Sequence, residues 1–196
     1  RIISSCYRKG IDEINAKFPN SYVYNEIVGA LQEVVGFEIV EQTENNCVLK
    51  EVSHPGVEEV DVVLRRMFLM LLEMGESALD AIQKKEFDRL QEVKLLEIGN
   101  NRFSAFLRRI LNKLVYKDRV TTVQLYILAR DLEQVADQYK HICSYCYKNK
   151  AALSKEISQL FDDINKYVRQ YYSLFYDSNL EKAQEFVFQK DKLMQE

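Results

Sequence analysis

The stretch that follows Gly56 constrains the fold most, because it contains no proline and has helical periodicity almost throughout. The whole chain of 196 residues holds two prolines and six glycines, so chain-breaking residues are scarce. Apolar residues recur at helical spacing in five segments: 58–84, 86–116, 122–148, 153–176 and 180 onward. The first three segments are long and separated by short breaks, which favours antiparallel packing of neighbouring helices. The sequence therefore predicts a helical bundle.

The residues before the His54-Pro55-Gly56 break follow a different pattern. They predict, in chain order, a short helix at 2–8, a strand at 12–18, a helix at 22–35 and a hairpin of strands at 37–41 and 47–50. The predicted fold class is mainly α, with a small α+β subdomain of β-α-β-β order ahead of the helices. We expect three parts: the α+β domain at 1–54, a three-helix unit at 57–149 and the first helices of a second, incomplete unit at 151–196.

A shift of 93 residues aligns the last two helical segments with the first two. It places Ala78–Ile82 on Tyr171–Phe175, and Asp88–Glu92 on Glu181–Glu185. Such a period indicates a duplicated unit, whose second copy lacks at least one helix here. The duplication predicts that three residues of the second copy turn inward: Phe161, Ile164 and Val168. Five aromatic residues form a further cluster, expected either in the core or at a protein interface: Tyr167, Tyr171, Tyr172, Phe175 and Tyr176.

Composition excludes several classes of protein. A net charge of −3 gives no electrostatic reason to expect binding to nucleic acid. No apolar run approaches 18 residues, so no membrane insertion is expected. The absence of a signal-peptide pattern and the four unpatterned cysteines predict a cytoplasmic protein. Cys143 and Cys146 have redox or zinc spacing, but they lie on an apolar helical stripe and are expected to pack in the core.

Two acids four residues apart, Glu133 and Asp137, lie in the middle of a long helical pattern at 122–147. Their side chains are expected about 140° away from the centre of the apolar stripe of that helix. Like charges at this spacing repel weakly unless a partner offsets them. Arg130, Lys140 and His141 lie on the same face and could be that partner on a solvated surface, and a hard cation held by the carboxylates is the other interpretation.

These motifs resemble the PhoU-like phosphate-uptake regulators in their archaeal form. Two segments carry the resemblance in the helical part, in the order expected for the family: 73–87 for the first helix and the turn after it, and 131–137 for the signature Asn-Leu-Glu-Arg-Ile-Ala-Asp. Three segments before the break are similar to the small α+β part of archaeal members: 1–7, 10–14 and 35–41. The resemblance covers nearly the whole chain.

The resemblance implies two tandem three-helix units that carry acid-x-x-x-Asp motifs for divalent or ferric metal ions. Glu133 and Asp137 match one motif, whereas the other departs from the pattern as Glu97 and Asn101. An amide ligates through its carbonyl without adding charge, so weaker metal affinity is expected. The corresponding region of the second unit, 190–194, carries no acid pair. Glu133, Asp137 and Glu97 are expected on one exposed surface, with Asn101 beside them.

The function implied by the resemblance is regulation of phosphate uptake and phosphate homeostasis, without enzymatic activity. The expected partner is the ATPase of a phosphate ABC transporter or a signalling protein, and a homodimer is a further expectation. No glycine loop for phosphate and no Gly-x-Ser-x-Gly or His-Glu-x-x-His motif occurs, which agrees with a binding role.

Two alternatives remain at this point. The chain would belong to a transcriptional regulator if an AbrB-like DNA-binding hairpin precedes Arg1. It would be a metal-storing or hydrolytic bundle if its helices carried inward-facing Glu and Glu-x-x-His pairs. No Glu-x-x-His occurs after Gly56.

Overall fold

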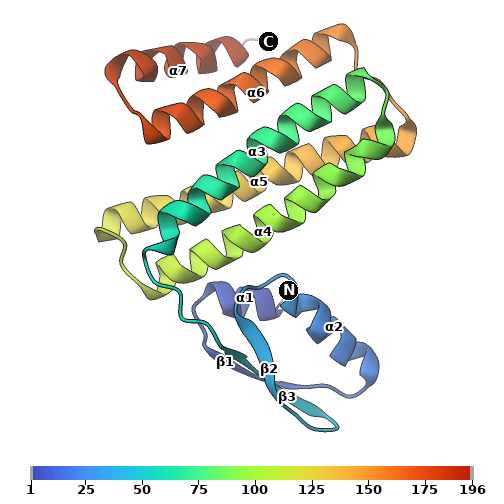
Figure 1. Ribbon diagram of the computed structural model, residues 1–196, viewed down its shortest axis with the longest axis vertical. Helices are drawn as coiled ribbons and strands as arrows, with labels where there is room; N and C mark the ends of the chain where they lie inside the picture. The colour runs from blue at the N-terminus through green and yellow to red at the C-terminus, as the bar shows by residue number, and fades with distance from the viewer. Residues whose placement is uncertain (1, 195–196) are drawn as a thin grey trace. The chain divides into compact units, whose positions relative to one another are not determined.

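The computed structural model describes residues 2–194, and Figure 1 shows the order of its elements. The α+β part contains α1 (Ile2–Arg8), β1 (Glu13–Lys17), α2 (Ser21–Leu31), β2 (Phe37–Gln42) and β3 (Asn46–Glu51). The helical part contains α3 (Glu59–Gln83), a short 3-10 turn η1 (Phe87–Arg89), α4 (Leu90–Lys113), α5 (Arg119–Asn149), α6 (Lys155–Tyr176) and α7 (Leu180–Leu193). The mainly helical fold with a small antiparallel sheet is therefore confirmed. Among the described helices, none has the length and apolar character needed to cross a membrane.

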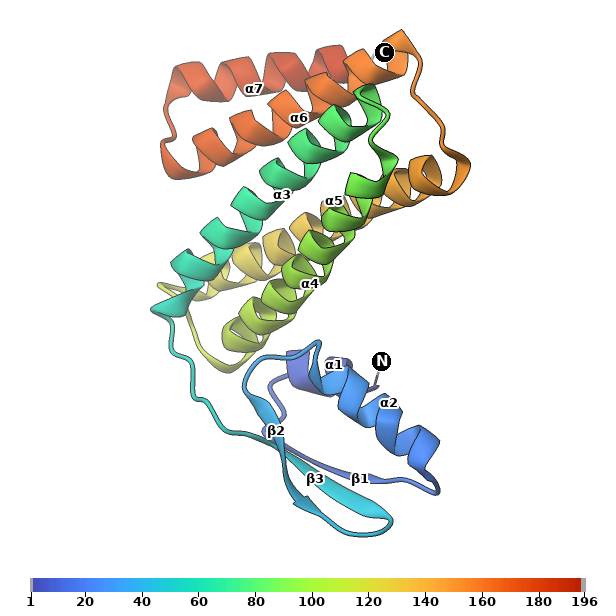
Figure 2. The same cartoon turned by 45° about the vertical axis from the view of Figure 1, so that its right-hand side comes forward.

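The three strands form one antiparallel sheet in the order β1-β3-β2. The hairpin predicted between β2 and β3 is confirmed, with a register shift between Ile39 and Glu41. Figure 2 shows α1 and α2 on one side of this sheet. The ring of Tyr7 in α1 meets that of Phe37 in β2 edge-on, with centroids 5.4 Å apart. These aromatic contacts give the small domain its own core.

Helix α2 ends at Leu31, although its periodicity predicted helix as far as Val35. Beyond Leu31 the amides of Glu33 and Val34 bond to carbonyls three residues back, which tightens the chain into turns. The turns lead to Gly36, whose φ of 74° lies in the left-handed region that glycine adopts without strain. The helix therefore ends at this turn, although the apolar periodicity of the sequence continues to Val35.

The chain divides into two compact units. The first comprises the chain up to Met67 together with Ile98–Glu133, and the second comprises Phe68–Glu97 together with 134–196. The predicted boundary at 54–57 falls in the loop between β3 and α3, but the small α+β domain groups with parts of α3, α4 and α5.

Amphipathic helices build the core of the first unit. Its buried residues come from one face of each helix: Val60, Val63, Leu64 and Met67 of α3, Leu107 and Ile110 of α4, and Leu125, Leu128, Ala129 and Leu132 of α5. Tyr116, in the turn after α4, donates its hydroxyl to Asp61 Oδ2 at 2.7 Å and so ties this turn to α3. The apolar stripes read from the sequence are thus the surfaces that pack.

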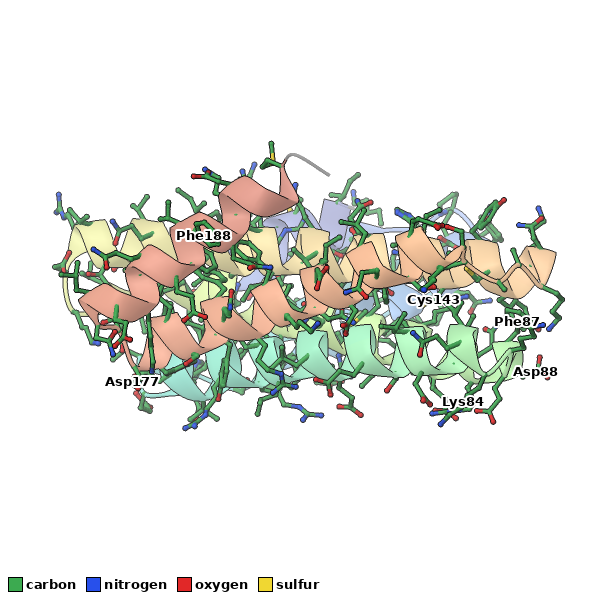
Figure 3. The ribbon with its side chains drawn as sticks, turned by 90° about the horizontal axis from the view of Figure 1, so that it is seen from above. Lys84, Phe87, Asp88, Cys143, Asp177 and Phe188 are labelled. Carbon is green, nitrogen blue, oxygen red and sulfur yellow. The ribbon has the colours of Figure 1, made fainter. Side chains whose placement is uncertain are left out.

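The core of the second unit combines aliphatic side chains with a group of aromatic rings. Phe68 of α3 is fully buried and is surrounded by four rings of α6: Tyr171, Tyr172, Phe175 and Tyr176. Tyr167 of α6 stacks on Phe186 of α7, with ring centroids 4.3 Å apart. The aromatic cluster predicted from the sequence therefore packs within the chain. Figure 3 shows α6 and α7 beside one another, with Phe188 of α7 labelled.

Two helix boundaries of the predicted second copy agree with the 93-residue shift, whereas α6 begins at Lys155, 96 residues after the start of α3 at Glu59. Helix α6 ends at Tyr176, 93 residues after the end of α3 at Gln83, and α7 begins at Leu180, 93 residues after the start of η1 at Phe87. Of the three residues predicted to turn inward, Phe161 is buried and Val168 is half-buried. Ile164 is 38% exposed, so the prediction is wrong for this residue.

Candidate functional site

Polar side chains form a stripe along α4 at helical spacing, and three of them contact polar residues of α5: Glu97 in the second unit, and Ser104 and Arg108 in the first. The stripe consists of Glu97, Asn101, Ser104 and Arg108. The residues of α5 are Tyr126, Glu133, Asp137 and Lys140. The four residues predicted as a metal site all belong to these two sets.

Glu133 lies in the first unit and has two partners on α4. Its Oε2 lies 2.6 Å from the hydroxyl of Ser104 and 3.3 Å from Nη1 of Arg108. The guanidinium of Arg108 also donates to the hydroxyl of Tyr126 at 3.1 Å. Ser104 is fully buried and its hydroxyl lies 3.2 Å from the carbonyl oxygen of Ala129. Glu133 therefore links α5 to α4 through a hydroxyl and a guanidinium.

Glu97 and Asp137 lie in the second unit and share one ammonium group. Lys140 Nζ donates to Glu97 Oε1 at 2.7 Å and to Asp137 Oδ1 at 2.5 Å. The side chain of Glu97 is 5% exposed, that of Lys140 is 25% exposed and that of Asp137 is 36% exposed. This group connects α4 to α5 by two charge-assisted hydrogen bonds.

Opposing effects set the pKa values in this group. Burial alone raises the pKa of the Asp137 carboxyl, but the hydrogen bond and charge of Lys140, together with Glu97 and His141, bring it below its usual value. Burial alone lowers the pKa of the Lys140 ammonium, whereas its bonds to Asp137 and Glu97 raise it above the usual value. Both groups are therefore charged at neutral pH.

The expectation that these acids lie on an exposed surface is wrong. Glu97 is buried, and Glu133, Asp137 and Asn101 are half-buried. A helix in a bundle contacts more than one neighbour, so the flank of α5 beside its apolar stripe also packs, here against α4. Lys140 is a partner of the acids as the sequence indicated, whereas Arg130 pairs with the adjacent Asp131 at 2.9 Å.

The predicted ligands do not fit a metal ion as they are arranged. Within residues 2–194, no group of three or more His, Cys, Asp or Glu side chains is placed to hold one. A hard cation would need oxygens of Glu97 and Asp137 within about 2.0–2.6 Å, and Lys140 Nζ occupies that position between them. The cation between these two acids is therefore a side chain of the protein.

Cys143 and Cys146 are both buried and reduced, as the sequence predicted. Burial, with a smaller effect of Cys146, raises the pKa of the Cys143 thiol to about 12. The reactive form of cysteine is the thiolate, so Cys143 is inert at neutral pH. Figure 3 labels its position on α5.

A second polar cluster, in the first unit, was missed by the sequence reasoning. Arg109 of α4 is 1% exposed. Its guanidinium binds both carboxylate oxygens of Glu51 at 3.0 Å and Asp12 Oδ1 at 2.6 Å. It also donates to the carbonyl oxygens of Tyr7 and Ile11 at 2.9 and 2.8 Å. The signal in the sequence was a charged residue within the apolar stripe of α4, directly before Ile110.

A third polar group, in the second unit, joins α3, α5 and α6. Asn165 of α6 donates to the carbonyl oxygen of Gly75 at 2.9 Å and accepts from the hydroxyl of Tyr139 at 2.7 Å. A Cβ at position 75 would lie 2.4 Å from Asn165 Oδ1 and 2.9 Å from the Tyr139 hydroxyl, so a residue larger than glycine would displace this polar group. In the Arg109 cluster, Arg109 and Glu51 are buried, whereas the side chain of Asp12 is 60% exposed.

The comparisons with known proteins identify no relative. No family model, no curated protein and no solved structure matches the chain.

Proposed function

We propose that this chain is a PhoU-like regulator of phosphate uptake that acts by binding another protein. The observation that carries the proposal is the agreement of two helix boundaries with the 93-residue shift, because tandem helical units are what the sequence resemblance implies. A small α+β domain precedes the helices, as the archaeal form of the family would have. The segment 131–137, which carries the resemblance to the family signature, lies within α5.

The arrangement of polar groups supports a binding role. The acids of α4 and α5 are held by Lys140, Arg108 and Ser104, and Arg109 is held by Glu51 and Asp12. These contacts hold neighbouring helices and strands of each unit together, so that the surface of each unit keeps one arrangement. A rigid surface loses little conformational entropy when it binds, and this favours recognition of a partner.

The partner that we propose is the cytosolic ATPase subunit of a phosphate ABC transporter, and a signalling protein that senses phosphate is the second. Both assignments come from the resemblance and place the chain in the cytoplasm. The regulator would bind the ATPase when phosphate is plentiful and so reduce uptake. The proposal does not require a bound metal ion, since the motif acids already have partners.

Phosphate uptake in cells tests this proposal. The gene that encodes the chain is deleted, and uptake of radiolabelled phosphate is measured after growth in high and in low phosphate. We expect excess uptake in high phosphate that returns to normal when the intact gene is restored. Unchanged uptake in the deletion strain at both phosphate levels would contradict the proposal.

A further inference from the structure

We propose that Lys140 is the resident cation between α4 and α5, so that its ammonium replaces the metal ion that the resemblance implies. The same two carboxylates, Glu97 and Asp137, would then accept a divalent cation only when the charge of Lys140 is removed. The inference concerns the folded chain and does not depend on the proposed partner. It can fail while the proposed regulation of uptake holds.

The geometry makes the two cations mutually exclusive. Lys140 Nζ lies 2.7 Å from Glu97 Oε1 and 2.5 Å from Asp137 Oδ1. Divalent ions such as Mg²⁺ and Ca²⁺ bind carboxylate oxygens at about 2.0–2.6 Å. A metal ion shared by these two oxygens would thus occupy the position of the nitrogen atom.

Burial makes a cation at this place necessary. The side chain of Glu97 is 5% exposed, so its carboxylate has lost most of its contact with water. A buried charge without a partner is strongly unfavourable. Lys140 comes from the other helix and meets this requirement, while its spacing of three residues from Asp137 brings the second carboxylate to the same nitrogen.

The first unit follows the same principle independently. Glu133, the other acid of the motif, binds Arg108 at 3.3 Å and the Ser104 hydroxyl at 2.6 Å. Each acid that the resemblance assigns to a metal ion is thus bound by a basic side chain of the protein: Glu97 and Asp137 by Lys140, and Glu133 by Arg108. The position that departs from the family pattern, Asn101, fits this interpretation because an amide adds no negative charge that would need a metal.

The test is thermal unfolding of metal-stripped protein with and without Mg²⁺, Mn²⁺ or Zn²⁺, together with calorimetric titration of the same ions. Lys140→Met keeps most of the side-chain volume and removes the charge, and Lys140→Arg keeps the charge. Lys150→Met is the control for loss of a lysine charge away from Glu97, because Lys150 is 57% exposed and its partners are Asp88 and the rings of Tyr147 and Phe87. The double variant Lys140→Met with Glu97→Gln removes the positive charge of Lys140 and the negative charge of the buried Glu97, and it leaves Asp137 unchanged.

We expect the melting temperature of the wild type, Lys140→Arg and Lys150→Met to be independent of metal. Lys140→Met should melt at least about 5 °C lower than the wild type, and a divalent ion should restore part of the loss. The double variant should recover stability without a response to metal, which keeps the test valid if Lys140→Met alone does not fold. A wild type that is stabilised by metal as much as Lys140→Met, or a Lys140→Met protein that no metal stabilises, would overturn the inference.

Discussion

Arg109 shows how one residue can hold two parts of the chain together. A guanidinium has five N–H donors, and at Arg109 each has an acceptor among Glu51, Asp12 and the carbonyl oxygens of Tyr7 and Ile11. Arg109 also lies over the rings of Tyr7 and Phe37, 4.9 and 5.0 Å from their centroids. All these partners belong to the α+β domain, whereas Arg109 belongs to α4. This residue therefore explains why the small domain and the adjoining helices form one compact unit.

Replacement of Arg109 by methionine should lower the free energy of unfolding by about 3–5 kcal/mol, because Glu51 would remain buried without its main partner. The side chain of Glu51 is 4% exposed, so water could not replace the guanidinium. Urea unfolding measures the change. Arg66→Met, at an exposed position on α3, is the control and should change stability by less than about 0.5 kcal/mol. Equal stability of the two variants would show that the cluster has no structural role.

The same clusters predict how stability depends on pH. A hydrogen bond from Lys113 lowers the pKa of the Asp12 carboxyl. Burial raises the pKa values of the Glu51 and Asp137 carboxyls, but the hydrogen bonds and charges of their basic partners lower them by more, so both lie below the usual value. Carboxyls with depressed pKa values in the folded state contribute stability above their unfolded pKa of about 4, and this contribution is lost as the pH falls through the folded values. We therefore expect the free energy of unfolding, measured with urea, to be constant between about pH 6 and pH 8. It should decrease steadily below about pH 4. A protein equally stable at about pH 3 and pH 7 would contradict this account.

At the scale of elements, close packing of α3, α5 and α6 depends on Gly75. An added Cβ would lie 2.4 Å from Asn165 Oδ1 and 2.9 Å from the hydroxyl of Tyr139. Gly75→Ala should therefore destabilise the protein by about 1–3 kcal/mol, despite the higher helix propensity of alanine. Gly29 in α2 is the matched control, since no heavy atom lies within 4 Å of its added Cβ.

Gly29→Ala should stabilise the protein by about 0.5 kcal/mol through the same propensity. Thermal and urea unfolding of the two variants give the comparison directly. If both variants shift stability in the same direction and by the same amount, the contact at Gly75 does not limit the approach of the helices.

Local patterns in the sequence predicted the elements well, because each has a strong signal. The period of two in β2 and β3, the helical periodicity of α3 to α6 and the break at Pro55 are all properties of neighbouring residues. The short turns after Leu31 were missed, since they depend on hydrogen bonds and a left-handed Gly36 rather than on apolar spacing.

The sequence identified the acids that lie between α4 and α5, but it did not show that they are buried there. Spacing placed Glu133 and Asp137 on one flank of α5, and it also gave Lys140 as a partner. Antiparallel packing also placed Glu97 beside these acids, but the burial of this flank was missed, because burial depends on contacts between residues far apart in the sequence such as Glu97 and Lys140. The Arg109 cluster was missed for the same reason, since its partners in the α+β domain precede it by 58 to 102 residues.

For the whole molecule, the loop at 52–56 is the place where the predicted domain boundary can be tested. Residues 52–54 are exposed and lack regular structure, so limited proteolysis should cleave there first. The two fragments of the wild type should elute together in native size-exclusion chromatography, because Arg109 and Lys113 bind Asp12 and Glu51 across the cut. The fragments of Arg109→Met should separate. Separation of the wild-type fragments would show that these contacts do not hold the small domain in place.

The proposed regulation of phosphate uptake depends on binding of the chain to a protein partner. Isothermal titration of the purified chain with the cytosolic ATPase subunit of the phosphate transporter from the same cells tests this claim most directly. Circular dichroism first confirms that the chain is folded and helical. We expect a saturable binding isotherm that is unchanged when metal ions are chelated. A flat titration with folded proteins on both sides would contradict it.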